Sequence, residues 1–140
     1  MPHHQGQCHC GNIRYIFETG LEIEDMVLRQ CDCSFCRKNG GRYTSDPRGA
    51  LSVTITDKEK VASYRFGHKT ADFIFCSICG VMPFITCRLE NKTFAVLNVN
   101  TLDQTSRLSG DLATMHFDGE EKLSRLARRQ KNWIGSVTYL

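Results

Sequence analysis

The chain has 140 residues, a formal net charge of +3 and a hydrophobic content of 41%, values that fit one soluble domain over residues 1–140. No apolar run approaches the roughly 18 residues of a membrane span, and the polar N-terminus lacks a secretion signal. We therefore expect a cytoplasmic protein without a membrane partner. Its charge is too small to indicate a polyanion partner by itself, so nucleic acid is not expected either.

In chain order, alternating apolar residues predict a series of short strands. Residues 13–18 alternate, a short apolar run over 26–30 leads into a cysteine-rich segment, and residues 50–56 alternate again. The ranges 61–66 and 70–75 flank Gly67-His68-Lys69 and predict a hairpin, a tight turn covers 76–80, and 81–87 and 94–100 complete the strands.

Only the end of the chain has helical spacing, in a tail over about residues 120–134. Glu120 and Glu121 fall in its first turn, where negative charge suits the helix dipole. Many short strands with one terminal helix predict a mainly-β fold. The side chains expected to pack inward are Leu123, Leu126 and Trp133, and those expected on the solvated face are Arg125, Arg128, Arg129 and Lys131.

Seven of the eight cysteines fall into three tight groups. Thiols stay reduced inside cells, so this pattern predicts metal ligands rather than disulfides. A closed zinc site takes four protein ligands and a catalytic one three, so four plus three thiols indicate one site of each kind. The groups are Cys8/Cys10, Cys31/Cys33/Cys36 and Cys76/Cys79.

The two cysteine pairs predict a closed structural zinc site. Each is followed by a glycine, Gly11 or Gly80, which tolerates the backbone angles of a tight turn around an ion. Pairing them would tie the N-terminal strand to the middle of the chain and contribute folding energy directly. The alternative is that these cysteines are buried free thiols or redox thiols.

The triplet Cys31/Cys33/Cys36 predicts a catalytic zinc with an open fourth position. Such an ion suits the capture of a substrate thiol as its thiolate. Arg37 and Lys38 follow directly and could bind carboxylates of an acidic thiol substrate. One alternative is a site closed by Cys87, His9 or another group; a second is an iron–sulfur cluster, which normally takes four cysteines at other spacings.

Three further residues carry weaker signals. Cys87 lies on a predicted strand and is interpreted as a small buried residue, although a zinc-stapled thiol oxidoreductase would need it as the spare thiol. His68 sits at the predicted hairpin tip, either as an exposed turn residue or as a substrate contact. His116 could face the core or approach the open zinc.

With these residues in place, the chain resembles the glutathione-dependent formaldehyde-activating family, which also contains centromere protein V. Seven cysteines in register make the resemblance specific. The segments that carry it are residues 6–15 (GQCHCGNIRY), 31–38 (CDCSFCRK), 64–69 (YRFGHK) and 75–84 (FCSICGVMPF), with weaker matches at 97–103 (LNVNTLD) and 116–119 (HFDG).

The resemblance implies a coiled β-sandwich, or β-tent, whose motif-bearing core covers about residues 6–119 and holds two zinc ions. By position, the structural ion would be held by Cys8, Cys10, Cys76 and Cys79. The catalytic ion would be held by Cys31, Cys33 and Cys36. The tail from residue 120 departs from the acidic, proline-containing ending common in the family and is basic instead.

The resemblance further implies a carbon–sulfur lyase or synthase that acts on glutathione or a related thiol adduct, as in S-hydroxymethylglutathione formation, with glutathione as co-substrate. Its expected partner is a small-molecule thiol, and a homodimer is left open. The alternative is a non-catalytic binding module in which both zinc ions are structural and the basic C-terminal helix contacts protein or nucleic acid.

Overall fold

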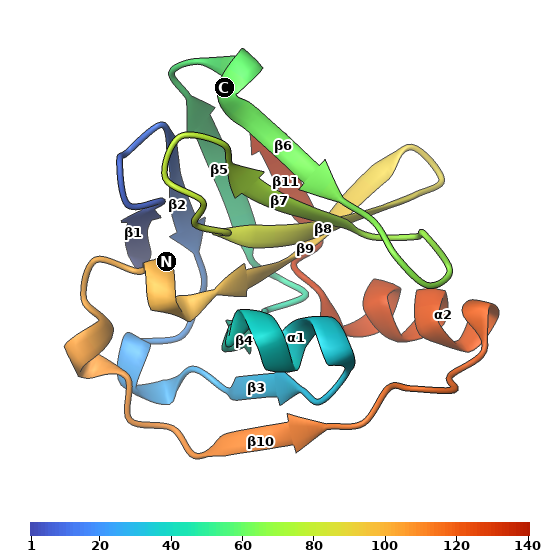
Figure 1. Cartoon of the computed structure of the whole chain (residues 1–140). Coiled ribbons are helices and arrows are strands. Elements are labelled where there is room, and N and C mark those ends of the chain that lie inside the picture. The colour runs from blue at the N-terminus through green and yellow to red at the C-terminus, as the bar shows by residue number, and fades with distance from the viewer.

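Two β-sheets form the framework of the chain, whose computed structural model describes residues 1–140 (Figure 1). The smaller sheet has the strand order β1-β2-β5-β11 and the larger the order β10-β3-β4-β9-β8-β7-β6. The smaller sheet consists of β1 (His3–Gln7), β2 (Ile13–Glu18), β5 (Ala50–Ile55) and β11 (Ser136–Tyr139). The larger consists of β3 (Leu28–Cys31), β4 (Tyr43–Thr44), β6 (Val61–Tyr64), β7 (Asp72–Cys76), β8 (Phe84–Leu89), β9 (Lys92–Asn98) and β10 (Leu112–Met115).

Both sheets are mixed. β11 pairs parallel with β5 and β10 parallel with β3, whereas the other strand pairs are antiparallel. The predicted mainly-β fold of packed sheets with a short C-terminal helix is confirmed. The predicted hairpin is also present as β6–β7, although its connecting loop is longer than Gly67–Lys69 because β6 ends at Tyr64 and β7 begins at Asp72.

Helices and short turns connect the strands. Helix α1 (Ser34–Asn39) follows β3, and α2 (Lys122–Asn132) lies between β10 and β11. Neither has the length and apolar character of a membrane-spanning helix. The 3₁₀ turns are Ile23–Asp25, Lys58–Lys60, Val99–Thr101 and Thr105–Arg107.

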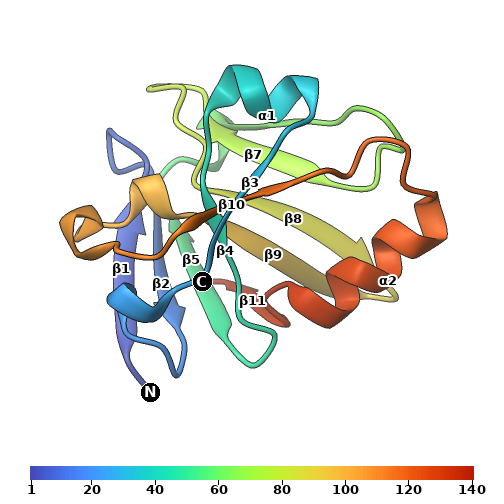
Figure 2. The same ribbon diagram turned by 90° about the horizontal axis from the view of Figure 1, so that it is seen from below.

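Strands β8 and β9 bury side chains on both of their faces, because successive residues of a strand point to opposite sides. On one face, Phe84 and Leu97 join a core that includes Phe17 and Leu51 of the smaller sheet. On the other face lies a second core, on the side of the sheet where α1 and α2 lie (Figure 2). That second core contains Cys33, Cys36, Tyr43, Ala71, Phe73, Met82, Ile85, Cys87, Phe94, Val96 and Trp133.

The expectations about where helices occur and about Leu123 are wrong. The sequence predicted helix only near the C-terminus, yet residues 34–39 form α1, so the cysteine triplet straddles a strand end and a helix start instead of a simple turn. Leu123 was expected to pack inward, yet it is 80% exposed. Leu126 and Trp133 do pack against the second core, and the buried Arg129 lies between them on the inward face of α2, where Leu123 does not reach.

We expect Phe84→Ala to lower the free energy of unfolding by about 3–5 kcal/mol, because Phe84 is fully buried between the two sheets and its loss leaves a cavity. Leu123→Ala is the matched control, since its side chain is in solvent, and it should change stability by less than about 0.5 kcal/mol. Urea denaturation of the metal-loaded protein measures both values. Equal losses in the two variants would contradict the assignment of Leu123 to the exposed face.

Candidate metal centres

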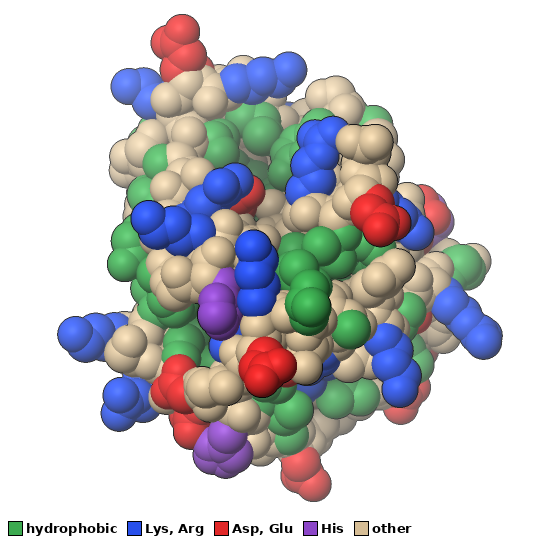
Figure 3. Space-filling view, turned by 90° about the vertical axis from the view of Figure 1, so that its right-hand side faces the viewer, with side chains coloured by type: hydrophobic (Ala, Val, Ile, Leu, Met, Phe, Trp, Pro, Cys, Tyr) green, Lys and Arg blue, Asp and Glu red, His purple; other side chains and the backbone are tan.

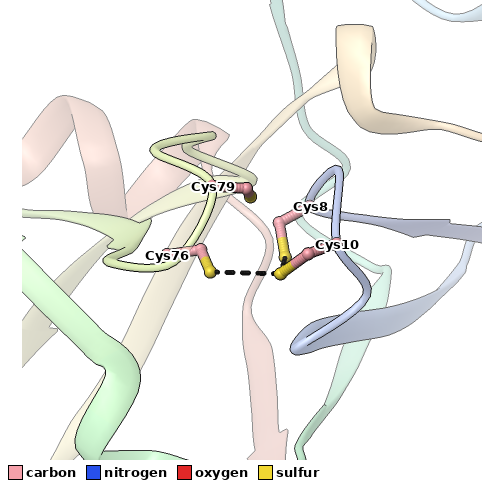
Figure 4. A group of neighbouring side chains, drawn as sticks. All are labelled: Cys8, Cys10, Cys76 and Cys79. Atoms are coloured by element: carbon pink, nitrogen blue, oxygen red, sulfur yellow. Dashed lines mark hydrogen bonds between the residues drawn. The ribbon is translucent and has the colours of Figure 1, made fainter.

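Four cysteines from the two sheets converge at one point (Figure 4). Cys8 and Cys10 lie in the loop between β1 and β2, Cys76 is the last residue of β7, and Cys79 lies in the turn before β8. The Cys8 and Cys10 sulfurs are 3.8 Å apart, and the Cys10 and Cys76 sulfurs 3.5 Å apart. All four sulfurs lie within 4.8 Å of one another.

The backbone of the two loops sets this geometry. The Cys8 sulfur accepts a hydrogen bond from the Ile13 amide at 3.3 Å, and the Gly80 amide donates to the Cys76 carbonyl at 2.7 Å. Gly11 and Gly80 have φ values of 85° and 79°, in the left-handed region that favours glycine. The turns after both cysteine pairs therefore depend on these two residues, as their spacing predicted.

The four sulfurs fit a tetrahedral zinc ion. A Zn–S bond of about 2.3 Å places tetrahedral sulfurs about 3.8 Å apart, close to the measured separations. Cys8 and Cys76 are fully buried in the core between the sheets. An ion held here would join the β1–β2 loop of the smaller sheet to the β7–β8 turn of the larger one.

The other three cysteines form a separate cluster on the opposite face of the larger sheet, also with sulfurs within 4.8 Å of one another. Cys31 ends β3, Cys33 caps α1, and Cys36 lies in the first turn of that helix. The Cys33 sulfur accepts a hydrogen bond from the Cys36 amide at 3.4 Å, and the Cys31 sulfur accepts one from the Cys33 amide at 3.5 Å.

These hydrogen bonds favour a thiolate at the strand end. Hydrogen bonding from the Cys36 thiol, with a further contribution from the Cys33 amide, lowers the pKa of Cys31 to about 6. The pKa of Cys36 shifts in the opposite direction, because its hydrogen bond to the Cys31 sulfur and its burial raise it. The cluster thus holds at least one ready thiolate donor, which is the form that binds a metal ion.

No fourth His, Cys, Asp or Glu side chain joins the triplet. Cys87 is buried in the second core, outside the cluster, and its sulfur lies 3.6 Å from Nη1 of Arg129. His116 is exposed, and its Nδ1 bonds to the carboxylate of Asp32. His68 is exposed near the backbone carbonyl of Glu120, and His9 is exposed in the β1–β2 loop beside the four-cysteine site.

A cavity of about 130 Å³ opens beside the triplet. One water molecule needs about 10–15 Å³ on this measure, so the cavity has room for a small molecule. Two thirds of its lining residues are hydrophobic, and all three cysteines of the triplet contribute to it. The other hydrophobic lining residues are Tyr43, Phe66, Ala71, Phe73, Ile85, Val96, Met115, Phe117 and Trp133.

The basic residues at this cavity differ from those that the sequence singled out. Arg37 and Lys38 are exposed on α1 and do not line it. Its arginines are Arg29 on β3 and three from α2, namely Arg125, Arg128 and Arg129. The last three were expected on the solvated face of the helix, and that expectation is wrong because positions three and four apart share one helix face, here the face toward the cavity.

The α2 arginines differ in their partners. Glu120 accepts hydrogen bonds from both Arg125 and Arg128 at 3.1 Å, and Arg128 also stacks over the Phe117 ring at 3.6 Å. These contacts lower the pKa of Glu120, chiefly through the bond from Arg128. Figure 3 views the side on which α2 lies, where charged side chains of both signs lie around an exposed apolar patch.

Comparisons with known proteins agree with this geometry. The sequence model of the family described as glutathione-dependent formaldehyde-activating enzyme matches residues 3–117. Among solved structures, the chain resembles a Rhodobacter sphaeroides protein determined by structural genomics, with 30% identity and a TM-score of 0.61 over 79% of this chain and 99% of that one. Since the matched residues include both thiol clusters, the chain belongs to the glutathione-dependent formaldehyde-activating family.

Proposed function

We propose that this chain is a zinc-dependent carbon–sulfur lyase or synthase that joins a small thiol, glutathione or a related one, to formaldehyde or a similar carbonyl compound. The observation that carries the proposal is the three-thiol cluster of Cys31, Cys33 and Cys36, which faces a cavity and has no fourth protein ligand. Family membership supports the same reaction type.

The two thiol clusters have different roles in this proposal. Cys8, Cys10, Cys76 and Cys79 hold a structural zinc ion and complete its coordination. Cys31, Cys33 and Cys36 hold the second ion, which when bound supplies an open position that stabilises a substrate thiolate at neutral pH. The amides of Cys33 and Cys36 keep this cluster in position through their hydrogen bonds to sulfur.

The reaction itself needs little beyond a thiolate and a dry, ordered cavity. The substrate thiol loses its proton, its sulfur attacks the carbonyl carbon, and a C–S bond forms while the C=O π electrons move to oxygen, which is then protonated. The lyase direction reverses these steps. The apolar walls, such as Phe73 and Val96, limit water around the reacting atoms, and the cavity brings the two reactants together.

The alternative, a non-catalytic module that binds through its basic helix, has less support. Two of the helix arginines are engaged by Glu120, and Arg129 is buried. The exposed cations that remain on α2 are Lys122 and Lys131. A surface with so few free cations is a weak basis for polyanion binding.

We expect Cys36→Ser to lower the catalysed exchange between formaldehyde and its thiol adduct by about 100-fold or more, because it removes a metal ligand at the cavity. Exchange NMR with glutathione and other thiols measures the acceleration over the spontaneous reaction, and native mass spectrometry counts bound zinc. Ser34→Ala, an exposed position of the same helix, is the control and should keep full activity. Full activity of Cys36→Ser on every thiol tried would refute the catalytic assignment.

Cobalt in place of zinc distinguishes an enzyme from a binding module. A centre with an open position changes its visible spectrum when a thiol is added, whereas a centre closed by four thiolates does not. We expect Cys36→Ser to abolish the spectral change that a thiol causes. In Cys79→Ser, the fraction of the protein that stays folded should still show this change. If the spectrum of the unmodified protein does not change when a thiol is added, the non-catalytic binding module is supported instead.

Loss of the four-thiolate centre should unfold the protein. Zinc binding by such a site contributes on the order of 10 kcal/mol, comparable to the whole stability of a domain. We therefore expect Cys76→Ser to lose one zinc ion and its cooperative thermal transition, as followed by circular dichroism. Cys36→Ser should also lose one ion but keep a cooperative transition, and equal unfolding of the two variants would contradict the division of roles.

A further inference from the structure

The cavity beside the triplet contains a buried guanidinium group without an acidic partner. Arg129 is 8% exposed, and no carboxylate lies within ion-pairing distance of it. Its Nη1 donates to the Thr70 hydroxyl at 2.7 Å and lies 3.6 Å from the Cys87 sulfur, while its guanidinium carbon is 5.0 Å from the centre of the Trp133 ring. A charge this deeply buried is costly unless an anion accompanies it.

One edge of this guanidinium has no hydrogen-bond partner. Both of its hydrogen bonds use Nη1, and Nε is buried without any partner. Nε and Nη2 therefore remain as a pair of parallel donors, the arrangement that binds a carboxylate through both oxygens. Burial also lowers the pKa of Arg129.

The other charges around the cavity do not neutralise Arg129. Arg125 and Arg128 share Glu120, Arg29 bonds to the neutral Ser45 hydroxyl, and Asp118 contributes the one carboxylate of the lining. Arginines thus outnumber carboxylates in the cavity wall. The rest of the lining is largely aromatic and aliphatic, so among the small thiols of the proposed function it favours one with an apolar body over glutathione, which is a peptide with many polar groups.

We infer that Arg129 is the specificity-determining residue of this cavity and binds the carboxylate of a thiol substrate with an apolar body, whose sulfur meets the Cys31/Cys33/Cys36 cluster. The inference rests on the proposed function for the position of the sulfur. Arg129 belongs to α2, which lies beyond residues 3–117 matched by the family model. The residue that selects the substrate would therefore lie outside the part of the chain that the family model matches.

Binding of unreactive probes tests the inference separately from catalysis. The probes are ω-(methylthio)alkanoates of increasing chain length and the corresponding neutral amides, titrated calorimetrically into the zinc-loaded protein. We expect the best carboxylate to bind about 10- to 100-fold more tightly than its amide, the range of one charge-assisted hydrogen-bonded contact. Arg129→Met should remove this preference and change amide binding little, whereas Arg129→Lys should restore part of it.

Matched variants test whether the preference for the carboxylate arises at Arg129. Lys131→Met removes an exposed charge from the same helix and should leave both probes unaffected. Thr70→Val keeps Arg129 but removes the hydroxyl that positions it, and should reduce the carboxylate preference by about 3- to 10-fold. This variant also tests the inference if Arg129→Met does not fold, which thermal melts and zinc counts would reveal.

Several outcomes would overturn the inference. These are equal binding of acid and amide by the unmodified protein, equal weakening of both probes by Arg129→Met, or a preference lost in Arg37→Met and kept in Arg129→Met. The last would restore the role that the sequence assigned to Arg37 and Lys38. Carboxylate binding that depends on Arg129, in a protein without thiol–formaldehyde exchange, would support this inference and refute the proposed function.

Discussion

The larger sheet has to bury apolar side chains on both of its faces, and this constraint determines where the two thiol clusters lie. Strands β8 and β9 contribute Phe84 and Leu97 to one core and Ile85 and Val96 to the other. The smaller sheet covers the first face, and the four-cysteine site joins the two sheets beside that core. The second face is covered by α1, by α2 and by the loop between β6 and β7, and a cavity remains at the three-cysteine site.

This difference in coverage gives chemically similar residues different surroundings. In the first cluster, Cys8 and Cys10 from one loop meet Cys76 and Cys79 from another. Four thiols therefore converge, enough to complete the coordination of a metal ion. In the second, Cys31, Cys33 and Cys36 come from one continuous segment, and no distant residue supplies a fourth donor. One cluster is therefore suited to stability and the other to an exchangeable ligand.

The features predicted correctly from the sequence are those that depend on local spacing. The cysteine groups needed only short separations and adjacent glycines, and β2 and β5 showed clear alternation. Helix α1 was missed because six residues contain too few apolar positions for a periodic signal. Strands β10 and β11 were missed because they lie at sheet edges and most of their residues are exposed, so no buried alternation marks them. Arg129 was misplaced because its spacing with Arg125 marks a shared helix face without showing which way that face points.

Helix α2 therefore matters more to the site than its position outside the family match suggests. Trp133, just beyond its end, and Leu126 close the second core, while Arg125, Arg128 and Arg129 add charge to a cavity whose candidate metal ligands come from residues 31–36. The cysteine cluster and the charged wall thus lie on separate segments that meet only in the folded chain. Under the proposed function, substitutions in α2 would consequently alter which thiol is held without disturbing the cluster, because none of its residues belongs to it.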